Sequence, residues 1–252
     1  MENQLLDLDL LNNKEGKSLS ALLMNGYETN SVEYIKKGFE LFKMNVGGFI
    51  GFILLAFLLR MAGNFIPFAS IFLIPLSMGM YVLAKKIDKN EPYQFSNFFD
   101  GYQKTGPLIG IAFLQGLIAI AIMLVFLLPF FLVVGFDFIN EIETASASDT
   151  NFISFILLAF LMVIIILLVL VSWTFSGLIL FFNERKVWDA MEISRKVITK
   201  KYLNWLGFLL LLGLINIAGC LFLFVGLLVT IPTTSCAIYV AYEEIIGLNL
   251  QD

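Results

Sequence analysis

The chain of 252 residues has no histidine, only two cysteines, and charged residues at only 14% of its positions. Without histidine, imidazole cannot serve as a general base, a proton relay or a metal ligand. Cys220 lies near an expected turn and Cys236 inside an expected helix, so we expect no disulfide. The formal net charge of −4 is mild and gives no basis for nucleic-acid binding. These absences leave no enzyme class, metal or cofactor that the composition favours.

Apolar residues dominate instead, at 59% of the chain, and the mean hydropathy is +0.88. A soluble domain usually carries charge at roughly a quarter of its positions. Apolar runs of 18 or more residues recur, and each is long enough to cross the roughly 30 Å hydrocarbon core as a helix. The runs lack the alternation of a transmembrane strand. We therefore expect an all-α polytopic membrane protein whose main partner is the lipid bilayer.

The apolar runs predict six transmembrane helices, arranged as three hairpins. The middle pair is longer than a bilayer requires, so it must tilt, kink or project, and Pro129 is an expected bend. The expected spans are 46–61, 68–85, 107–135, 152–182, 202–218 and 221–242.

Basic residues set the expected orientation of these spans. Of the sixteen lysines and arginines, all except Arg60 fall in segments on one side of the predicted spans. The opposite loop, "DFINEIETASASDT" from Asp137, carries acids and no lysine or arginine. By the positive-inside rule the basic side is cytoplasmic, so both termini should be cytoplasmic. The beginning of the chain does not resemble a signal peptide.

An amphipathic segment precedes each predicted hairpin: "VEYIKKGFELFK" from Val32, "FSNFFDGYQK" from Phe95 and "VWDAMEISRKVITKK" from Val187. Apolar residues on one face and flanking lysines are typical of helices that lie in the lipid headgroup region. In the second segment, Ser96 is an expected helix cap. The expected faces are Val32, Ile35, Phe39 and Phe42; Phe95, Phe98, Phe99 and Tyr102; and Val187, Ala190, Met191, Ser194, Val197 and Ile198.

Nearly the same phrase occurs twice, as "IPLSMGMYVLAKK" from Ile74 and "IPTTSCAIYVAYEE" from Ile231. It aligns Pro75 with Pro232 and brings Tyr81 and Tyr239 to matching places. We interpret the chain as three repeats in the same orientation, each an interfacial helix followed by a hairpin. The two prolines mark either a shared bend, which we favour, or an opened backbone that binds a substrate.

This interpretation divides the chain into a cytoplasmic N-terminal tail, a transmembrane domain and a short cytoplasmic C-terminal tail. The tails are residues 1–30 and 248–252, and the domain is 31–247, with units of about 31–90, 91–183 and 184–247.

The third unit carries an "A…SR" amphipathic helix (Ala190, Ser194 and Arg195), then a glycine-rich hairpin, then a proline and a tyrosine. With these features the chain resembles an uncharacterised bacterial group of six-helix membrane proteins that includes the membrane domain of some glycerophosphoryl diester phosphodiesterases. The resemblance covers roughly residues 32–247 and rests on topological motifs. It implies a six-helix integral membrane fold in the bacterial inner membrane, but no activity and no catalytic residues. Neither the phosphodiesterase chemistry nor carotenoid cleavage by His-ligated iron is expected of a chain without histidine.

Other residues carry weaker signals. Arg60 suits a phosphate or headgroup site, or a side chain that reaches the outer interface. Gln115 suits a polar path or a hydrogen bond between helices. The GxxxG pairs Gly47–Gly51 and Gly106–Gly110 indicate close helix contact, within the fold or with a partner.

Two hypotheses on function follow. The first is a non-enzymatic scaffold or accessory subunit of a cell-envelope complex, in contact with other inner-membrane proteins. The alternative is a transporter or flippase for a lipid or another amphipathic molecule. An intramembrane enzyme is the weakest option, because no acid–base pair or metal cluster can be assembled from the sequence.

Overall fold

The computed structural model describes residues 18–65, 69–144, 149–222 and 224–250, and its elements there are all helical. The first half contains α2 (Leu19–Asn25), α3 (Ser31–Met44), α4 (Val46–Gly63), α5 (Ala69–Phe72), the 3₁₀ helix η1 (Pro75–Met78), α6 (Gly79–Asp88) and the 3₁₀ helix η2 (Phe95–Lys104). The second half contains α7 (Thr105–Thr144), α8 (Asp149–Val171), α9 (Ser176–Phe182), α10 (Val187–Lys200), α11 (Tyr202–Leu221) and α12 (Leu227–Ile245).

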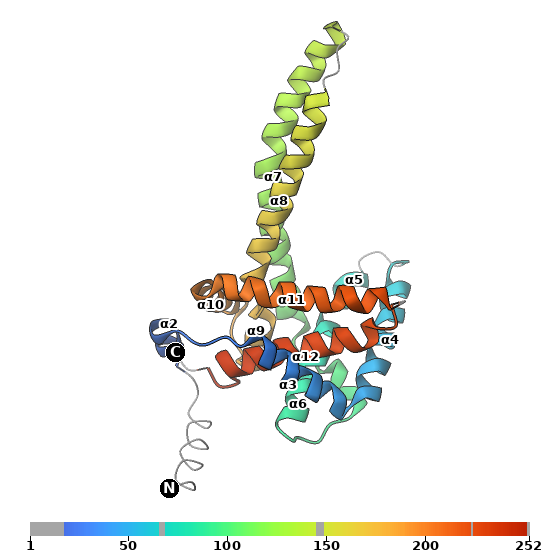
Figure 1. Cartoon of the computed structure of the whole chain (residues 1–252), viewed down its shortest axis with the longest axis vertical. Helices are drawn as coiled ribbons and strands as arrows, with labels where there is room; N and C mark the ends of the chain where they lie inside the picture. The colour runs from blue at the N-terminus through green and yellow to red at the C-terminus, as the bar shows by residue number, and fades with distance from the viewer. Residues whose placement is uncertain (1–17, 66–68, 145–148, 223, 251–252) are drawn as a thin grey trace.

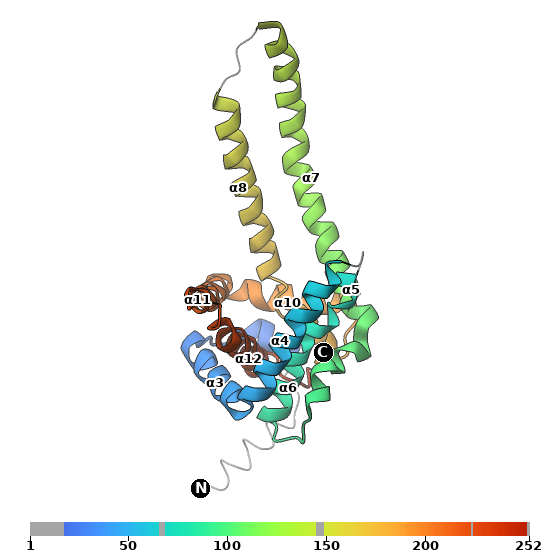
Figure 2. The same ribbon diagram turned by 90° about the vertical axis from the view of Figure 1, so that its right-hand side faces the viewer.

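The helices form a body from which one long hairpin projects. Figure 1 shows α7 and α8 rising from the body while α11 and α12 run crosswise to them. Figure 2 shows the two arms of the α7–α8 hairpin running in nearly the same direction, with a gap between them along their length. The hairpins therefore do not share one direction, and six side-by-side crossings are not confirmed.

Within the described ranges, five helical segments are long and apolar enough to span a membrane: Val46–Gly63, Ala69–Asp88, Phe95–Phe126, Ile156–Phe182 and Tyr202–Leu221. These confirm membrane-spanning potential for five of the six expected spans. The sixth, α12, is not among them, because Pro232, its hydroxyl residues and the Glu243–Glu244 pair lower its apolar character. Large apolar side chains on α4, α7, α8 and α11 are exposed, as membrane helices require.

Two expected spans are interrupted rather than continuous. The span expected over 68–85 begins at a residue outside the described ranges and consists of α5, η1 and α6. Pro75 has no backbone N–H to continue an α-helix, and the chain proceeds as a 3₁₀ turn. The span expected over 152–182 breaks between α8 and α9, where the Thr174 hydroxyl donates to the Val171 carbonyl at 2.7 Å. Local hydroxyl bonds of this kind compete with the helical pattern.

The outer loop expected from Asp137 is largely helical. α7 continues to Thr144 and α8 begins at Asp149, so only residues 145–148 of that expected loop fall outside the described ranges. α7 is helical on both sides of Pro129, where a bend was expected.

Each amphipathic segment packs against another part of the protein rather than lying free. α3 packs along α12, η2 packs on η1 and α6, and α10 packs on α9. The packing is cyclic with respect to the three expected units. α3 of the first unit lies on the second hairpin helix of the third, η2 of the second unit on that of the first, and α10 of the third unit on that of the second. Protein therefore covers the expected face of α10 and only part of the other two, since Val32, Phe39, Phe95 and Tyr102 stay exposed. The location of these helices in the headgroup region stays a prediction.

A small residue makes the closest approach in each of the three contacts. A Cβ atom on Gly38 would lie 2.9 Å from the Thr233 carbonyl oxygen, and one on Gly101 would overlap the Pro75 carbonyl oxygen. In α10, the Ser194 hydroxyl donates to the Ser172 carbonyl at 2.9 Å and accepts from the Phe175 N–H at 3.2 Å. Each of the three segments thus brings a small residue close to the backbone of the segment that it packs on, through close packing at Gly38 and Gly101 and through hydrogen bonds at Ser194.

The buried face of α10 is as expected, but that of α3 is not. α3 begins after Asn30, whose side chain accepts from the Glu33 N–H. It buries Tyr34, Gly38, Leu41 and Phe42, while Val32 is 71% exposed. α3 therefore has two apolar faces: one packs against α12, and the other is exposed.

The segment 95–104 forms a 3₁₀ helix, which the pattern did not predict. Its threefold period places Phe98 and Gly101 in one line, and both are buried. Its start is held by Asn97, whose side-chain Oδ1 accepts from the Gln94 N–H at 2.8 Å, and not by the expected Ser96. Phe98 stacks on Phe52 of α4, with ring centroids 4.2 Å apart.

Candidate functional site

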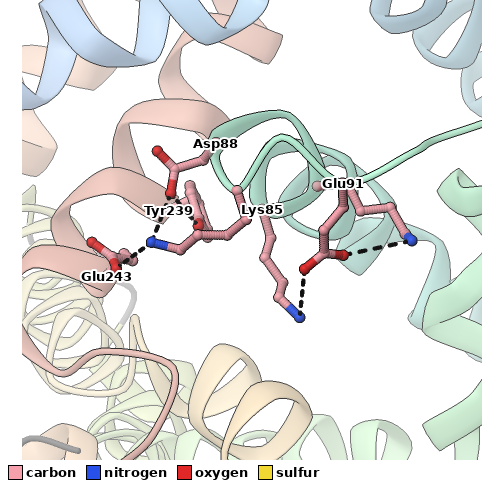
Figure 3. A network of polar contacts seen from close by, with 7 residues as sticks. Lys85, Asp88, Glu91, Tyr239 and Glu243 are labelled. Carbon is pink, nitrogen blue, oxygen red and sulfur yellow. Dashed lines mark hydrogen bonds and ion pairs between the residues drawn. The ribbon is translucent and has the colours of Figure 1, made fainter. Parts of the chain in front are cut away.

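A polar cluster joins the end of α6 to the last turns of α12. Figure 3 shows Lys85, Asp88 and Glu91 from the α6 end beside Tyr239 and Glu243 from α12. α6 ends at Asp88, and Asn90 follows with a φ of 53°, a left-handed conformation that asparagine tolerates. This turn brings the charged end of α6 against α12.

Direct contacts hold the two helices together. The Tyr239 hydroxyl donates to Asp88 Oδ2 at 3.0 Å. Lys89 Nζ lies 2.7 Å from Glu243 Oε1 and 3.2 Å from Asp88 Oδ2. Burial alone would lower the pKa of Lys89, but its bonds to Glu243 and Asp88 hold that pKa above the ordinary value. Lys89 is therefore a cationic bridge between two carboxylates on different helices.

Opposite charges occupy matching places in the repeated phrase. Lys85 and Lys86 close the first copy, and Glu243 and Glu244 close the second. The two lysines contact Glu91, at 3.9 and 3.8 Å, and Lys37 of α3 lies 3.4 Å from Glu244. The cluster thus connects α3, α6 and α12.

A cavity of about 320 Å³ lies beside this cluster, between α3, α6 and α12. Its polar lining comes from Lys37, Glu40, Asp88, Asn90, Tyr239, Glu243 and Glu244. Among the residues that the structure describes, no group of three or more histidine, cysteine or acidic side chains is arranged to hold a metal ion. The arrangement is suited to fixing helix ends together.

The structure separates the residues that the sequence singled out. Tyr239 belongs to the polar cluster, whereas Tyr81 and Gln115 line a different cavity, between η1, α6, α7 and the α8–α9 junction. Pro75 begins η1 and Pro232 lies inside α12, and both are buried. Pro75 coincides with a break between helices, whereas α12 continues through Pro232. The shared bend stays a prediction.

The glycine pairs and Arg60 have mixed surroundings. A Cβ atom on Gly47 or Gly106 would meet nothing within 4 Å, whereas one on Gly51 would lie 3.7 Å from the Phe95 ring and one on Gly110 3.2 Å from Val187. Close packing within the fold therefore involves only the second glycine of each pair. Arg60 lines an outer cavity of about 410 Å³ with Gly63, Asn64 and Ser70.

Sequence reasoning missed the pairing of Asp88 and Lys89 with α12. The available signal was charge near the ends of the two copies of the repeated phrase: Lys89 follows the first copy, and Glu243 and Glu244 close the second, so the two helix ends can attract each other. Hydrophobic periodicity carries no information on which units meet.

Exchanging the charges of one pair tests the cluster. We expect Lys89→Glu to lower the free energy of unfolding by about 1 kcal/mol, because partly exposed ion pairs contribute roughly 0.2–1 kcal/mol and the variant adds repulsion. The double variant Lys89→Glu/Glu243→Lys should recover most of the loss. Since the pKa of Lys89 is raised, this contribution is fully present below the pKa of an unfolded lysine and is lost as the pH rises through the higher folded value.

Thermal unfolding in detergent, followed by circular dichroism, measures the effect. Lys36→Glu on the exposed side of α3 is the matched control and should change little, since no ion pair of Lys36 with a described residue is present. A double variant no more stable than the single one would contradict the bridge.

No family model, curated protein or solved structure matches the chain.

Proposed function

We propose that the chain is a multi-pass protein of the bacterial inner membrane, built from three repeats in one orientation, with six crossings and both termini in the cytoplasm. The distribution of basic residues supports the orientation. The cyclic packing of α3, η2 and α10 supports the three repeats, because each of these segments packs on the second hairpin helix of another unit. Since α7–α8 and α11–α12 run crosswise, both hairpins can cross one flat bilayer only if each is inclined (Figure 1).

Within this arrangement we propose a non-enzymatic role as a scaffold or accessory subunit of a cell-envelope membrane complex. The observation that carries the proposal is the α7–α8 hairpin, whose outer part stands clear of the other helices (Figures 1 and 2). Large apolar side chains on both arms are exposed, among them Phe113 on α7 and Leu157 and Phe160 on α8. The inner part of α7 packs on the body, but the outer part of the hairpin does not, so this outer part presents two long surfaces to other transmembrane helices.

Co-purification tests this role. We expect the protein at native expression to be recovered in mild detergent with a defined set of inner-membrane proteins. Leu157→Ala/Phe160→Ala should reduce that recovery about fivefold or more, because truncation removes packing contacts that hold helices together in lipid. Quantitative mass spectrometry of the purified complexes measures the ratio.

The matched control is Leu210→Ala/Leu214→Ala on α11, where the side chains are about 61–62% exposed, compared with 63–65% for Leu157 and Phe160. This control should leave recovery unchanged. A wild-type protein that elutes as a lone monomer, or equal losses in the two double variants, would refute the assignment of the hairpin as the docking element.

A further inference from the structure

A second cavity, of about 230 Å³, lies among apolar helices away from the charged cluster, between η1, α6, α7 and the α8–α9 junction. Its polar lining comes from Ser77, Tyr81, Gln115, Thr174 and Ser176, beside the ring of Trp173. All of these residues belong to segments long and apolar enough to span a membrane. A concentration of uncharged polar groups inside such segments requires a physical account, because each is costly in hydrocarbon unless hydrogen-bonded.

Two helix interruptions meet at this cavity. One is the 3₁₀ turn of η1, which contributes Ser77; the other is the break between α8 and α9, which contributes Thr174. Irregular backbone at membrane depth is tolerated where it is buried in protein or lines a cavity, and interrupted helices of this kind form the binding sites of many membrane proteins. Here both interruptions face one space.

Hydrogen bonding in the cavity is incomplete. Ser77, Thr174 and Ser176 each donate to a nearby backbone carbonyl at 2.7 Å, so their hydroxyl oxygens keep accepting capacity. Gln115 Nε2 donates to Ser176 Oγ at 3.3 Å. Within the described part of the chain, neither the Gln115 Oε1 oxygen nor the Tyr81 hydroxyl has a hydrogen-bond partner. The cavity therefore offers one strong donor and several acceptors.

We propose that this cavity binds the uncharged, hydroxyl-bearing head of an amphipathic lipid, such as a glycerol-like group, whose chain lies along the exposed apolar faces of α7 and α8. Among the residues that the structure describes, no lysine, arginine, aspartate or glutamate lines the cavity. A phosphate or carboxylate would lose its hydration there without gaining an opposite charge, whereas a hydroxyl both accepts from Tyr81 and donates to Gln115. The site rests on the proposed membrane location, but it requires no partner protein.

Photolabelling of the purified full-length protein in phosphatidylcholine vesicles tests the site. Three probes carry the same diazirine-bearing acyl chain and differ only in the head: a monoacylglycerol, a fatty acid and a lysophosphatidylcholine. We expect the monoacylglycerol to label peptides from 105–126 and 156–182 at least fivefold more than the other two. Gln115→Leu and Tyr81→Phe should each reduce that labelling about threefold to tenfold, the effect of losing one hydrogen bond within a membrane.

Thr230→Val is the matched control, because it also removes one hydroxyl from an apolar helix, lies outside this cavity, and replaces an oxygen that has no hydrogen-bond partner among the described residues. It should leave the labelling unchanged. Equal labelling by the three heads, no labelling of these peptides, or labelling that neither Gln115→Leu nor Tyr81→Phe reduces would overturn the site. Because the purified protein is used alone, these outcomes are independent of whether a partner complex exists.

Discussion

Gly101→Leu should prevent the protein from accumulating in a folded form, whereas Gly106→Leu, only five residues away, should be tolerated. A side chain at Gly101 would overlap the Pro75 carbonyl oxygen and press on Met78. A Cβ atom at Gly106 would meet nothing within 4 Å. Overpacking a well-filled core costs typically 1–3 kcal/mol and occasionally more, and here the obstacle is backbone that cannot move as a side chain can.

The contact at Gly101 is matched by one in the opposite direction. Gly79 at the start of α6 faces the Phe98 carbonyl oxygen, so η2 and the continuous segment η1–α6 approach backbone to backbone from both sides. Displacing η2 would also remove Phe98 from its stack with Phe52. We therefore expect Gly101→Leu to cost about 3 kcal/mol or more, a large part of a typical stability of 5–15 kcal/mol.

Protein yield and the elution profile in detergent measure the outcome, and Gly101→Ala gives a graded version in which a reduced midpoint of thermal unfolding is expected. Gly106→Ala should leave that midpoint unchanged or raise it slightly, because alanine favours helix more than glycine does. If the two alanine variants unfold alike, the close packing of η2 on η1 does not contribute to stability as described.

The turn between α11 and α12 should be reachable from the outer side of the membrane. In a background of Cys220→Ala/Cys236→Ala, a cysteine placed by Phe222→Cys should react with a membrane-impermeant maleimide in right-side-out vesicles. Phe222 is 74% exposed at the end of α11, so access within the protein is not limiting. A cysteine placed by Lys200→Cys, at the other end of the hairpin, should react only after the vesicles are opened.

We expect at least a tenfold difference in labelling between the two positions, because a hydrated maleimide does not cross the apolar core. This experiment decides between two arrangements that the crosswise helices allow. Labelling of both positions only in opened vesicles would mean that α11 and α12 lie along the inner surface. Because α12 is not among the described segments apolar enough to span a membrane, composition does not decide between these two arrangements, and the labelling does.

Much of the local structure could be predicted from the sequence. The all-helical class, the apolar length of five segments and the buried face of α10 follow from composition and from a period of 3.6 residues. The start of α4 at Val46 follows from Asn45, whose side chain caps the helix by accepting from the Gly48 N–H. These features depend on residues that are near one another in the chain.

The candidate sites were not predictable in the same way. Tyr239 was singled out, but its partner Asp88 was not, and Tyr81 and Gln115 were named without the interrupted helices that bring them to one cavity. Hydrophobic patterns give the face of a helix, but they do not identify what covers that face. The buried side of α3 was misassigned for this reason. α3 has two apolar faces, and the contact with α12 decides which of them is buried.

The sequence alone therefore determined the helical, membrane-compatible character of the chain, because the free energy of apolar burial and the periodicity of helices are properties of consecutive residues. The tertiary structure decided which helices meet: α3 on α12, η2 on α6 and α10 on α9. It also decided where helices break and which carbonyls a glycine or serine can approach. These outcomes depend on contacts between residues far apart in the chain, and backbone groups left free at a break gain partners only when another helix arrives.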